Sequence, residues 1–351
     1  MIKSVTVTNY LGDSIKLILG EPEKSGFLIK SIEGLGPPKA NINVTEISTS
    51  DGSMYNSSRL DNRNIVFELI FVEVCGEGNR VIETIEDVRQ KSYTYFPIKK
   101  QIELVVETDN RIVKTTGYVE SNEPEIFSEQ EGSQISIICP DPFFYGTDVS
   151  TNLYSVEPAF EFPFSNDSLT KDELVFGHIY IVTEGTIKYA GEAEVGMTIY
   201  IDAVGIAKKL TIYNVHTRKT MSLDTSKIPA IITSALNKEL AYWQGIQLLH
   251  EEGTTARTEA DAEVSRIQSL IEGVPSDGIV DGDTLVIKTS KGEMGISLTR
   301  GDMTYNILNC LDRNSDWLRL THGSNTIAFT SEEGISNLRF RIENKVVYEG
   351  V

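Results

Sequence analysis

The sequence predicts a mainly β protein of two domains, the second of which carries an inserted helical hairpin. Apolar and polar residues alternate over many short segments in both halves of the chain, which is the period of a half-buried strand. The prolines of Pro140-Asp141-Pro142 interrupt that pattern, because proline cannot donate a hydrogen bond to a strand ladder. Between residues 228 and 276, apolar residues recur every three or four positions, as in a helix.

These observations divide the chain. We expect an N-terminal domain over residues 1–146 and a C-terminal domain over residues 147–351, with the helical hairpin at 228–276 inside the second.

The N-terminal domain is expected to be a small β fold. The Asp109-Asn110 pair suits a tight turn and predicts a hairpin over residues 101–119. Residues 65–74 are apolar enough to be a central strand, and further strands are expected at 101–107, 111–119 and 133–139.

One helix is predicted in the N-terminal domain, at about residues 83–95. Thr84 and Asp87 have the spacing of a capping box, with aspartate in place of glutamate. Pro97 ends the helix, because the residue before a proline avoids helical backbone angles.

The C-terminal domain is predicted to be a sandwich of antiparallel sheets, since glycines separate short strand segments at regular spacing. The strands expected before the helical hairpin are 178–183, 186–190, 193–201, 209–215 and 219–224, and those expected after it are 282–287, 293–298, 324–330 and 337–348. The later strands complete the sandwich begun by the earlier ones.

The helical hairpin has two apolar stripes, separated by Glu251-Glu252-Gly253-Thr254-Thr255. Two interpretations stay open. The stripes pack on each other and on the sandwich, or the hairpin is a docking arm for a partner or a neighbouring subunit.

The bulk composition excludes several partner classes. The net charge of −19 repels phosphate backbones, so nucleic acid is not an expected partner. No apolar run approaches the roughly 18 residues of a membrane span, so no membrane partner is expected. The first residues alternate like a strand and lack the pattern of a signal peptide, which predicts synthesis and folding in a cytoplasm.

We expect no enzyme, cofactor or metal site. The sequence has no Gly-x-Ser-x-Gly, His-Glu-x-x-His or P-loop motif. None of its 4 histidines lies in a recognisable nucleophile motif. The acidic segment Asp277–Asp283 lacks the spacing of a calcium-binding loop. Cys75 and Cys139 lie in apolar runs and are expected to be buried free thiols.

Several segments resemble, in order along the chain, motifs of the distal tail proteins of long-tailed phages. They are Asp51-Gly52 with 59–65, 140–145, 282–289, 312–327 and 348–351. Lys288 departs from the pattern, in which an aspartate is common.

The resemblance implies a tail-tube-like N-terminal domain and a galectin-like C-terminal sandwich. It implies a hexameric ring of identical subunits at the virion tail tip, in which a protruding hairpin at 101–119 and the helix near 83–95 contact neighbouring subunits. The implied partners are other copies of the chain, the tail-tube protein, a tail-associated fibre or tape-end protein, and a receptor-binding protein. The role would be that of a structural baseplate protein of a phage or prophage.

A carbohydrate-binding adsorption module is the alternative function. Sugar sites use an exposed aromatic platform with polar neighbours, and Trp317 beside Asp316 and Arg319 is the candidate. The competing interpretation is that Trp317 packs in the core. Arg300-Gly301-Asp302 matches an adhesion tripeptide, and a plain turn is the preferred explanation.

Overall fold

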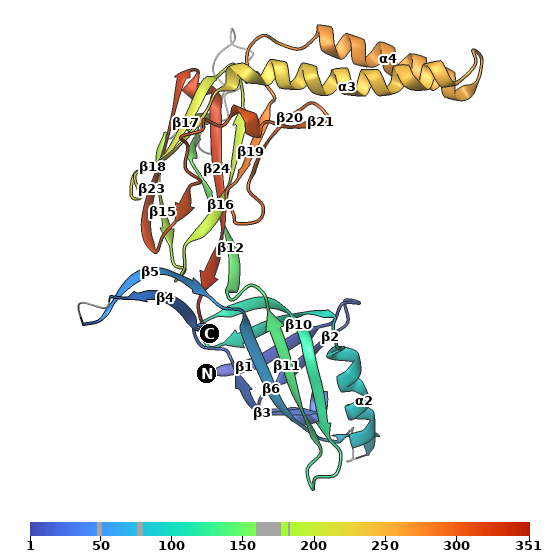
Figure 1. Cartoon of the computed structure of the whole chain (residues 1–351), viewed down its shortest axis with the longest axis vertical. Coiled ribbons are helices and arrows are strands. Elements are labelled where there is room, and N and C mark those ends of the chain that lie inside the picture. The colour runs from blue at the N-terminus through green and yellow to red at the C-terminus, as the bar shows by residue number, and fades with distance from the viewer. Residues whose placement is uncertain (48–50, 76–79, 159–176, 182) are drawn as a thin grey trace, which may run out of the picture. The chain divides into compact units, whose positions relative to one another are not determined.

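The chain is mainly β, as predicted, and it forms two compact units (Figure 1). The computed structural model describes residues 1–47, 51–75, 80–158, 177–181 and 183–351. The first unit contains Met1–Thr147, Gly191–Ala193 and Lys345–Val351, and the second contains Asp148–Ala190 and Glu194–Asn344. No helix among the described residues has the length and apolarity needed to cross a membrane.

An antiparallel sheet forms the first unit. Its strands, in spatial order, are β2 (Ser14–Ile18), β1 (Ile2–Thr8), β9 (Gln101–Thr108), β10 (Ile112–Glu125), β11 (Gly132–Cys139), β6 (Arg63–Phe71) and β3 (Phe27–Glu33). The predicted strand at 65–74 is confirmed as the interior strand β6, and alternate residues along it are buried.

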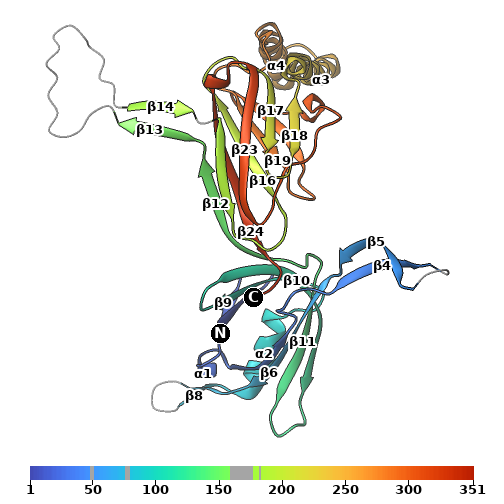
Figure 2. The same cartoon turned by 90° about the vertical axis from the view of Figure 1, so that its left-hand side faces the viewer.

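The helix α2 (Ile85–Tyr95) covers this core with Val88, and the following Phe96 is fully buried (Figure 2). The predicted capping box is confirmed, because the Thr84 hydroxyl accepts from the Asp87 backbone N–H and the Thr84 N–H donates to the Asp87 carboxylate. The backbone N–H and the hydroxyl of Thr84 both donate to the Asp87 carboxylate, and these two hydrogen bonds lower its pKa.

Smaller elements complete the first unit. They are α1 (Pro22–Ser25) and two ribbons, β4 (Ala40–Glu46) with β5 (Ser53–Leu60), and β7 (Val74–Cys75) with β8 (Val81–Glu83).

Two expectations for this unit are wrong. Cys75 is exposed, because the buried strand β6 ends at Phe71 and Cys75 lies in the separate β7–β8 ribbon. The hairpin at 101–119 exists but does not protrude. Its strand β9 lies between β1 and β10, and Ile102, Leu104 and Val106 are buried in the core of the first unit.

Arg63 is the centre of the first unit's polar network. It is 3% exposed, and its guanidinium donates to the backbone carbonyls of Pro142, Gly34, Gly36 and Glu349 at 2.5–2.7 Å. The guanidinium carbon of Arg63 lies 4.3 Å from the centre of the Phe144 ring. Burial lowers the pKa of this guanidinium. Three of the segments that carry the family resemblance, 59–65, 140–145 and 348–351, therefore meet at or next to one side chain.

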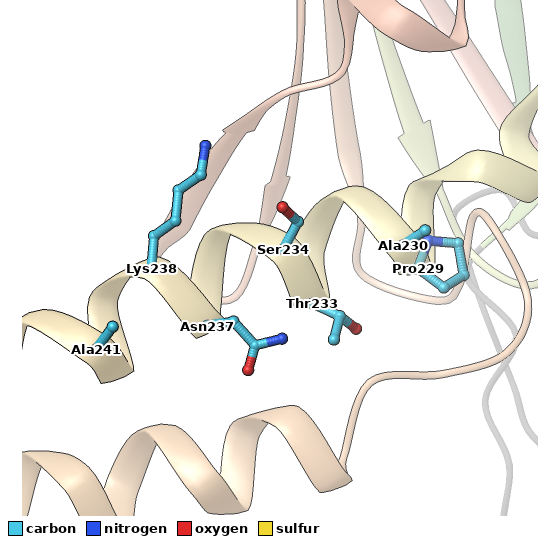
Figure 3. A pocket seen from close by; sticks show the side chains of 7 residues that line it. All are labelled: Pro229, Ala230, Thr233, Ser234, Asn237, Lys238 and Ala241. Atoms are coloured by element: carbon cyan, nitrogen blue, oxygen red, sulfur yellow. The ribbon is translucent and has the colours of Figure 1, made fainter. Parts of the chain in front are cut away.

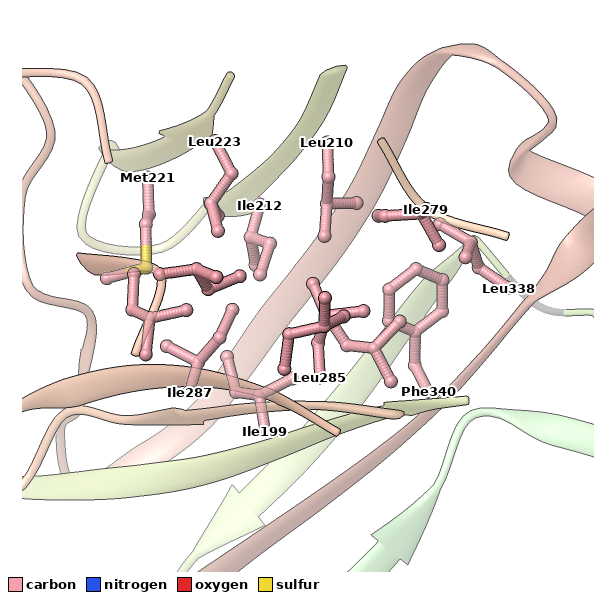
Figure 4. Close-up of a cluster of buried hydrophobic side chains, with 14 of the residues drawn as sticks. Ile199, Leu210, Ile212, Met221, Leu223, Ile279, Leu285, Ile287, Leu338 and Phe340 are labelled. Carbon is pink, nitrogen blue, oxygen red and sulfur yellow. The ribbon is translucent and has the colours of Figure 1, made fainter. Parts of the chain in front are cut away.

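Two sheets form the second unit. One has the order β24 (Leu338–Tyr348), β16 (Val195–Ala203), β19 (Thr284–Lys288), β20 (Gly295–Arg300) and β21 (Met303–Asn306), and the other has β15 (Glu184–Tyr189), β23 (Gly323–Glu333), β17 (Lys208–Asn214) and β18 (Lys219–Leu223). Figure 4 shows residues of both sheets facing one another, with Ile199 and Ile287 on one side and Leu210 and Ile212 on the other. The predicted sandwich of antiparallel sheets is confirmed, and β21 is a strand that the sequence pattern did not indicate.

The predicted helical hairpin is also confirmed, as α3 (Ile228–Leu249) and α4 (Thr255–Glu272). It extends from one end of the sandwich (Figure 1). Its root is part of the sandwich core, since Ile228, Ile232 and Ile267 are buried there. The other elements of the second unit are β13 (Tyr154–Pro158), β14 (Gly177–Ile181), η2 (Thr225–Lys227), η3 (Leu308–Cys310), β22 (Arg319–Leu320) and η4 (Ile335–Asn337), and β12 (Phe144–Asn152) enters it from the first unit.

We predict that Arg63→Leu lowers the free energy of unfolding by about 3 kcal/mol, because it leaves several carbonyls without a donor. Arg63→Lys should also destabilise, because an ammonium cannot span the same carbonyl positions. Urea denaturation followed by circular dichroism measures both effects. Arg59→Lys is the matched control, since the Arg59 side chain is 78% exposed. Equal stabilities for the Arg63 and Arg59 variants would contradict the role given to Arg63.

Candidate interaction surface

The β4–β5 ribbon, hereafter the β4–β5 arm, has no core of its own. Every residue of β4 is exposed, as is every residue of β5 except Leu60. It projects from the first unit in both views (Figures 1 and 2). An isolated two-stranded ribbon is only marginally stable in water, so an extended arm of this kind needs a surface to lie against.

The arm carries apolar side chains in the open. Ile42 is 59% exposed, Val44 is 47% exposed and Tyr55 is 61% exposed. Val44 pairs directly with Tyr55, and Ile42 lies two residues before Val44, so the three side chains share one face of the ribbon. Exposed apolar residues gathered on one face indicate a protein contact.

The root of the arm is fixed by the first unit. The carbonyls of Gly34 and Gly36, just before β4, accept hydrogen bonds from Arg63. The backbone N–H of Val351 donates to the carbonyl of Leu35 at 3.0 Å. The arm is therefore held firmly at one end and left uncovered along its length.

A second apolar projection of the first unit lies between β10 and β11. Phe127 is fully exposed and Ile126 is 43% exposed at this turn. Neither this turn nor the arm is among the contact segments predicted from the sequence. The alternation Ile42-Asn43-Val44 before the Asp51-Gly52 turn is the local signal for the arm, because it has the form of a hairpin.

The candidate sugar residues lie beside the second unit's core. Trp317 is partly buried and packs against that core, next to the fully buried Leu318. The backbone N–H of Asp316 donates to the carbonyl of Thr220 at 2.8 Å. The carbonyl of Arg319 accepts from the Asn214 side chain at 2.9 Å. Residues 316–319 therefore help to close the sandwich.

The adhesion-like tripeptide is also part of the packing. The Arg300 guanidinium donates to both Asp283 carboxylate oxygens, at 2.8 and 2.6 Å, and to the Gly278 carbonyl at 2.9 Å. The Asp283 side chain is fully buried, so this bidentate pair is shielded from water. It ties β20 to the loop that follows the helical hairpin.

A polar hollow of about 520 Å³ lies near the root of the helical hairpin. Charged side chains that line it form ion pairs with one another, for example Lys208 with Glu333 at 2.7 Å. Among the described residues that line it, none is aromatic. The hollow therefore lacks the flat apolar platform on which sugar rings stack.

Comparisons with known proteins identify the fold. No family model matches the sequence, and no curated protein matches it. The crystal structure of the Dit protein of phage SPP1, described as a paradigm of the hub adsorption apparatus in phages that infect Gram-positive bacteria, is similar with a TM-score of 0.55 and 13% identity. The alignment covers 98% of this chain and 99% of that one.

The activated phage P2 baseplate with calcium also matches, with a TM-score of 0.40, 10% identity and coverage of 98% of both chains. The same baseplate with strontium matches with a TM-score of 0.38, 10% identity and coverage of 97% of both chains. The chain has the fold of the SPP1 Dit protein, and the resemblance to phage distal tail proteins that its sequence motifs indicate is confirmed at the level of the fold.

Proposed function

We propose that this protein is a structural hub of a phage or prophage tail tip, where it forms a hexameric ring that joins the tail tube to the adsorption apparatus. The observation that carries the proposal is the fold match to the SPP1 Dit protein over nearly the whole length of both chains. Such a subunit holds other proteins in place and catalyses no reaction. Its partners are the tail-tube protein on one side, a fibre or tape-end protein on the other, and a receptor-binding protein.

The β4–β5 arm supplies a means of forming the ring. An arm that leaves one subunit and lies on the next makes a head-to-tail contact, and such contacts close into a ring when the rotation between subunits fits. The apolar face of Ile42, Val44 and Tyr55 is the part of the arm that gains most from being covered. If every arm lies on the next subunit, each ribbon is stabilised by its neighbour. An isolated ribbon has no such support.

We predict that replacing residues 41–59 by a short Gly-Ser linker abolishes rings and leaves folded monomers. Light scattering coupled to size exclusion, with negative-stain images, reports the assembly state. Circular dichroism confirms that the two units stay folded.

A finer test separates the apolar face from the arm as a whole. The triple substitution of Ile42, Val44 and Tyr55 by serine should prevent assembly, while Asn43→Ser with Asn56→Ser should not. Rings that persist in the triple variant would refute the role of the arm, and wild-type protein that stays monomeric at every concentration would count against the ring itself.

Carbohydrate binding by the second unit is the competing function. The packing of Trp317 against the sandwich core favours a structural role for this residue. We predict that Trp317→Ala lowers the free energy of unfolding by about 2 kcal/mol, because it removes partly buried aromatic surface. Tyr242→Ala is the control, since Tyr242 is 64% exposed.

A cell-wall pull-down with the full chain decides between the two functions. We expect no binding that depends on Trp317. Binding that is lost in a folded Trp317→Ala protein and kept in Tyr242→Ala would establish the sugar-binding alternative.

A further inference from the structure

The helix α3 carries apolar side chains on its exposed surface as well as on the side that it buries. Tyr242 is 64% exposed, Leu248 is 88% exposed and Leu249 is 82% exposed. Within residues 228–249 only Lys238 and Glu239 are charged. A surface helix normally turns a charged face to water, as α4 does with residues such as Glu259 and Asp261. These exposed apolar side chains would be removed from water if another protein covered them.

A shallow, open hollow of about 660 Å³ lies along α3, and Figure 3 shows the side chains that line it. Small or short side chains line it, and Lys238 stands at its edge. We call this surface the α3 hollow. The short side chains are Pro229, Ala230, Thr233, Ser234, Asn237 and Ala241. Lys238 is exposed and forms no ion pair with the described residues. The hollow is thus a shallow surface of short side chains with one cation, unpaired among the described residues, beside it, and it favours a partner that brings apolar side chains next to negative charge.

The far end of the helical hairpin carries negative charge, whereas the α3 hollow has the positive charge of Lys238 at its edge. Leu248 and Leu249 project at the end of α3, and the exposed Glu251 and Glu252 follow them. Neither glutamate forms an ion pair with the described residues. We call residues 248–252 the hairpin tip. It is an apolar knob with an acidic rim.

The hairpin tip and the α3 hollow carry opposite charges, but the tip of one chain cannot reach the hollow of the same chain. Leu248 lies about 20 Å along the helix from the middle of the hollow, at a rise of about 1.5 Å per residue. A second copy of the chain carries both surfaces and has no such restriction. Since the contact uses two different surfaces, it repeats head to tail and is compatible with a closed ring.

We propose that the hairpin tip of one subunit docks in the α3 hollow of the next copy, with Leu248 and Leu249 in the hollow and Glu251 and Glu252 beside Lys238. This inference rests on the proposed ring. It assigns the helical hairpin to subunit contact, in addition to the β4–β5 arm. Desolvated apolar contact supplies the attraction, and the lysine and glutamates set the register.

Disulfide trapping tests the contact in the full chain. In a Cys75→Ser background, Leu248→Cys is combined with Ser234→Cys, which places one thiol on the tip and one in the hollow of every copy. Mild oxidation should yield covalent dimers and larger species on a non-reducing gel. The matched control pairs Leu248→Cys with Ser265→Cys, because Ser265 is exposed on α4 and outside the hollow. Trapping that is no greater than in the control overturns the proposal.

Charge reversal gives a second readout. Lys238→Glu should raise the dissociation constant of self-association at least tenfold, and adding Glu251→Lys with Glu252→Lys should restore it. Light scattering over a concentration series measures both. Rings that form normally without tip-to-hollow trapping would refute this contact and leave the proposed function intact. Absence of both rings and trapping would refute the contact and the proposed ring together.

Discussion

One buried cation organises the first unit. The Arg63 guanidinium is held by four backbone carbonyls and an aromatic ring. A buried guanidinium with unpaired N–H groups is costly, so the three stretches of chain that supply those carbonyls must close around it together. These stretches are the root of the β4–β5 arm, the entry to β12 and the C-terminal residues. The position of the arm therefore depends on the same residue that closes the fold.

Three projections of the chain carry exposed apolar residues. Such residues occur on the β4–β5 arm, at the turn between β10 and β11, and along α3 to its tip. Each unit buries a full set of large side chains without them. Surface of this kind does not help a lone chain fold, and its natural use is contact between proteins. The distribution of apolar surface thus fits a subunit whose work is assembly.

Residues that look functional in isolation are used by the packing. Arg300 belongs to an adhesion-like tripeptide, yet its side chain is committed to the buried Asp283 carboxylate. Trp317 has the chemistry of a sugar platform, yet it rests on the sandwich core. Short motifs carry little information without their surroundings, because the same side chain serves packing or recognition according to what lies next to it.

Local sequence patterns were enough to predict the individual helices and many of the strands. A nearly continuous apolar run predicted β6, and period-two alternation predicted β11. Period-3.6 stripes predicted α3 and α4, and the Thr84 and Asp87 pair predicted the start of α2. All of these signals depend on near neighbours in the chain. Which strands lie inside a sheet and which stand alone depends on contacts between distant parts of the chain, and the sequence patterns did not predict it. The strand β9 is interior and β4 is uncovered, although both alternate, since pairing partners distant in sequence set burial. The convergence on Arg63 and the exposure of Cys75 were decided in the same way, by contacts that no local pattern records.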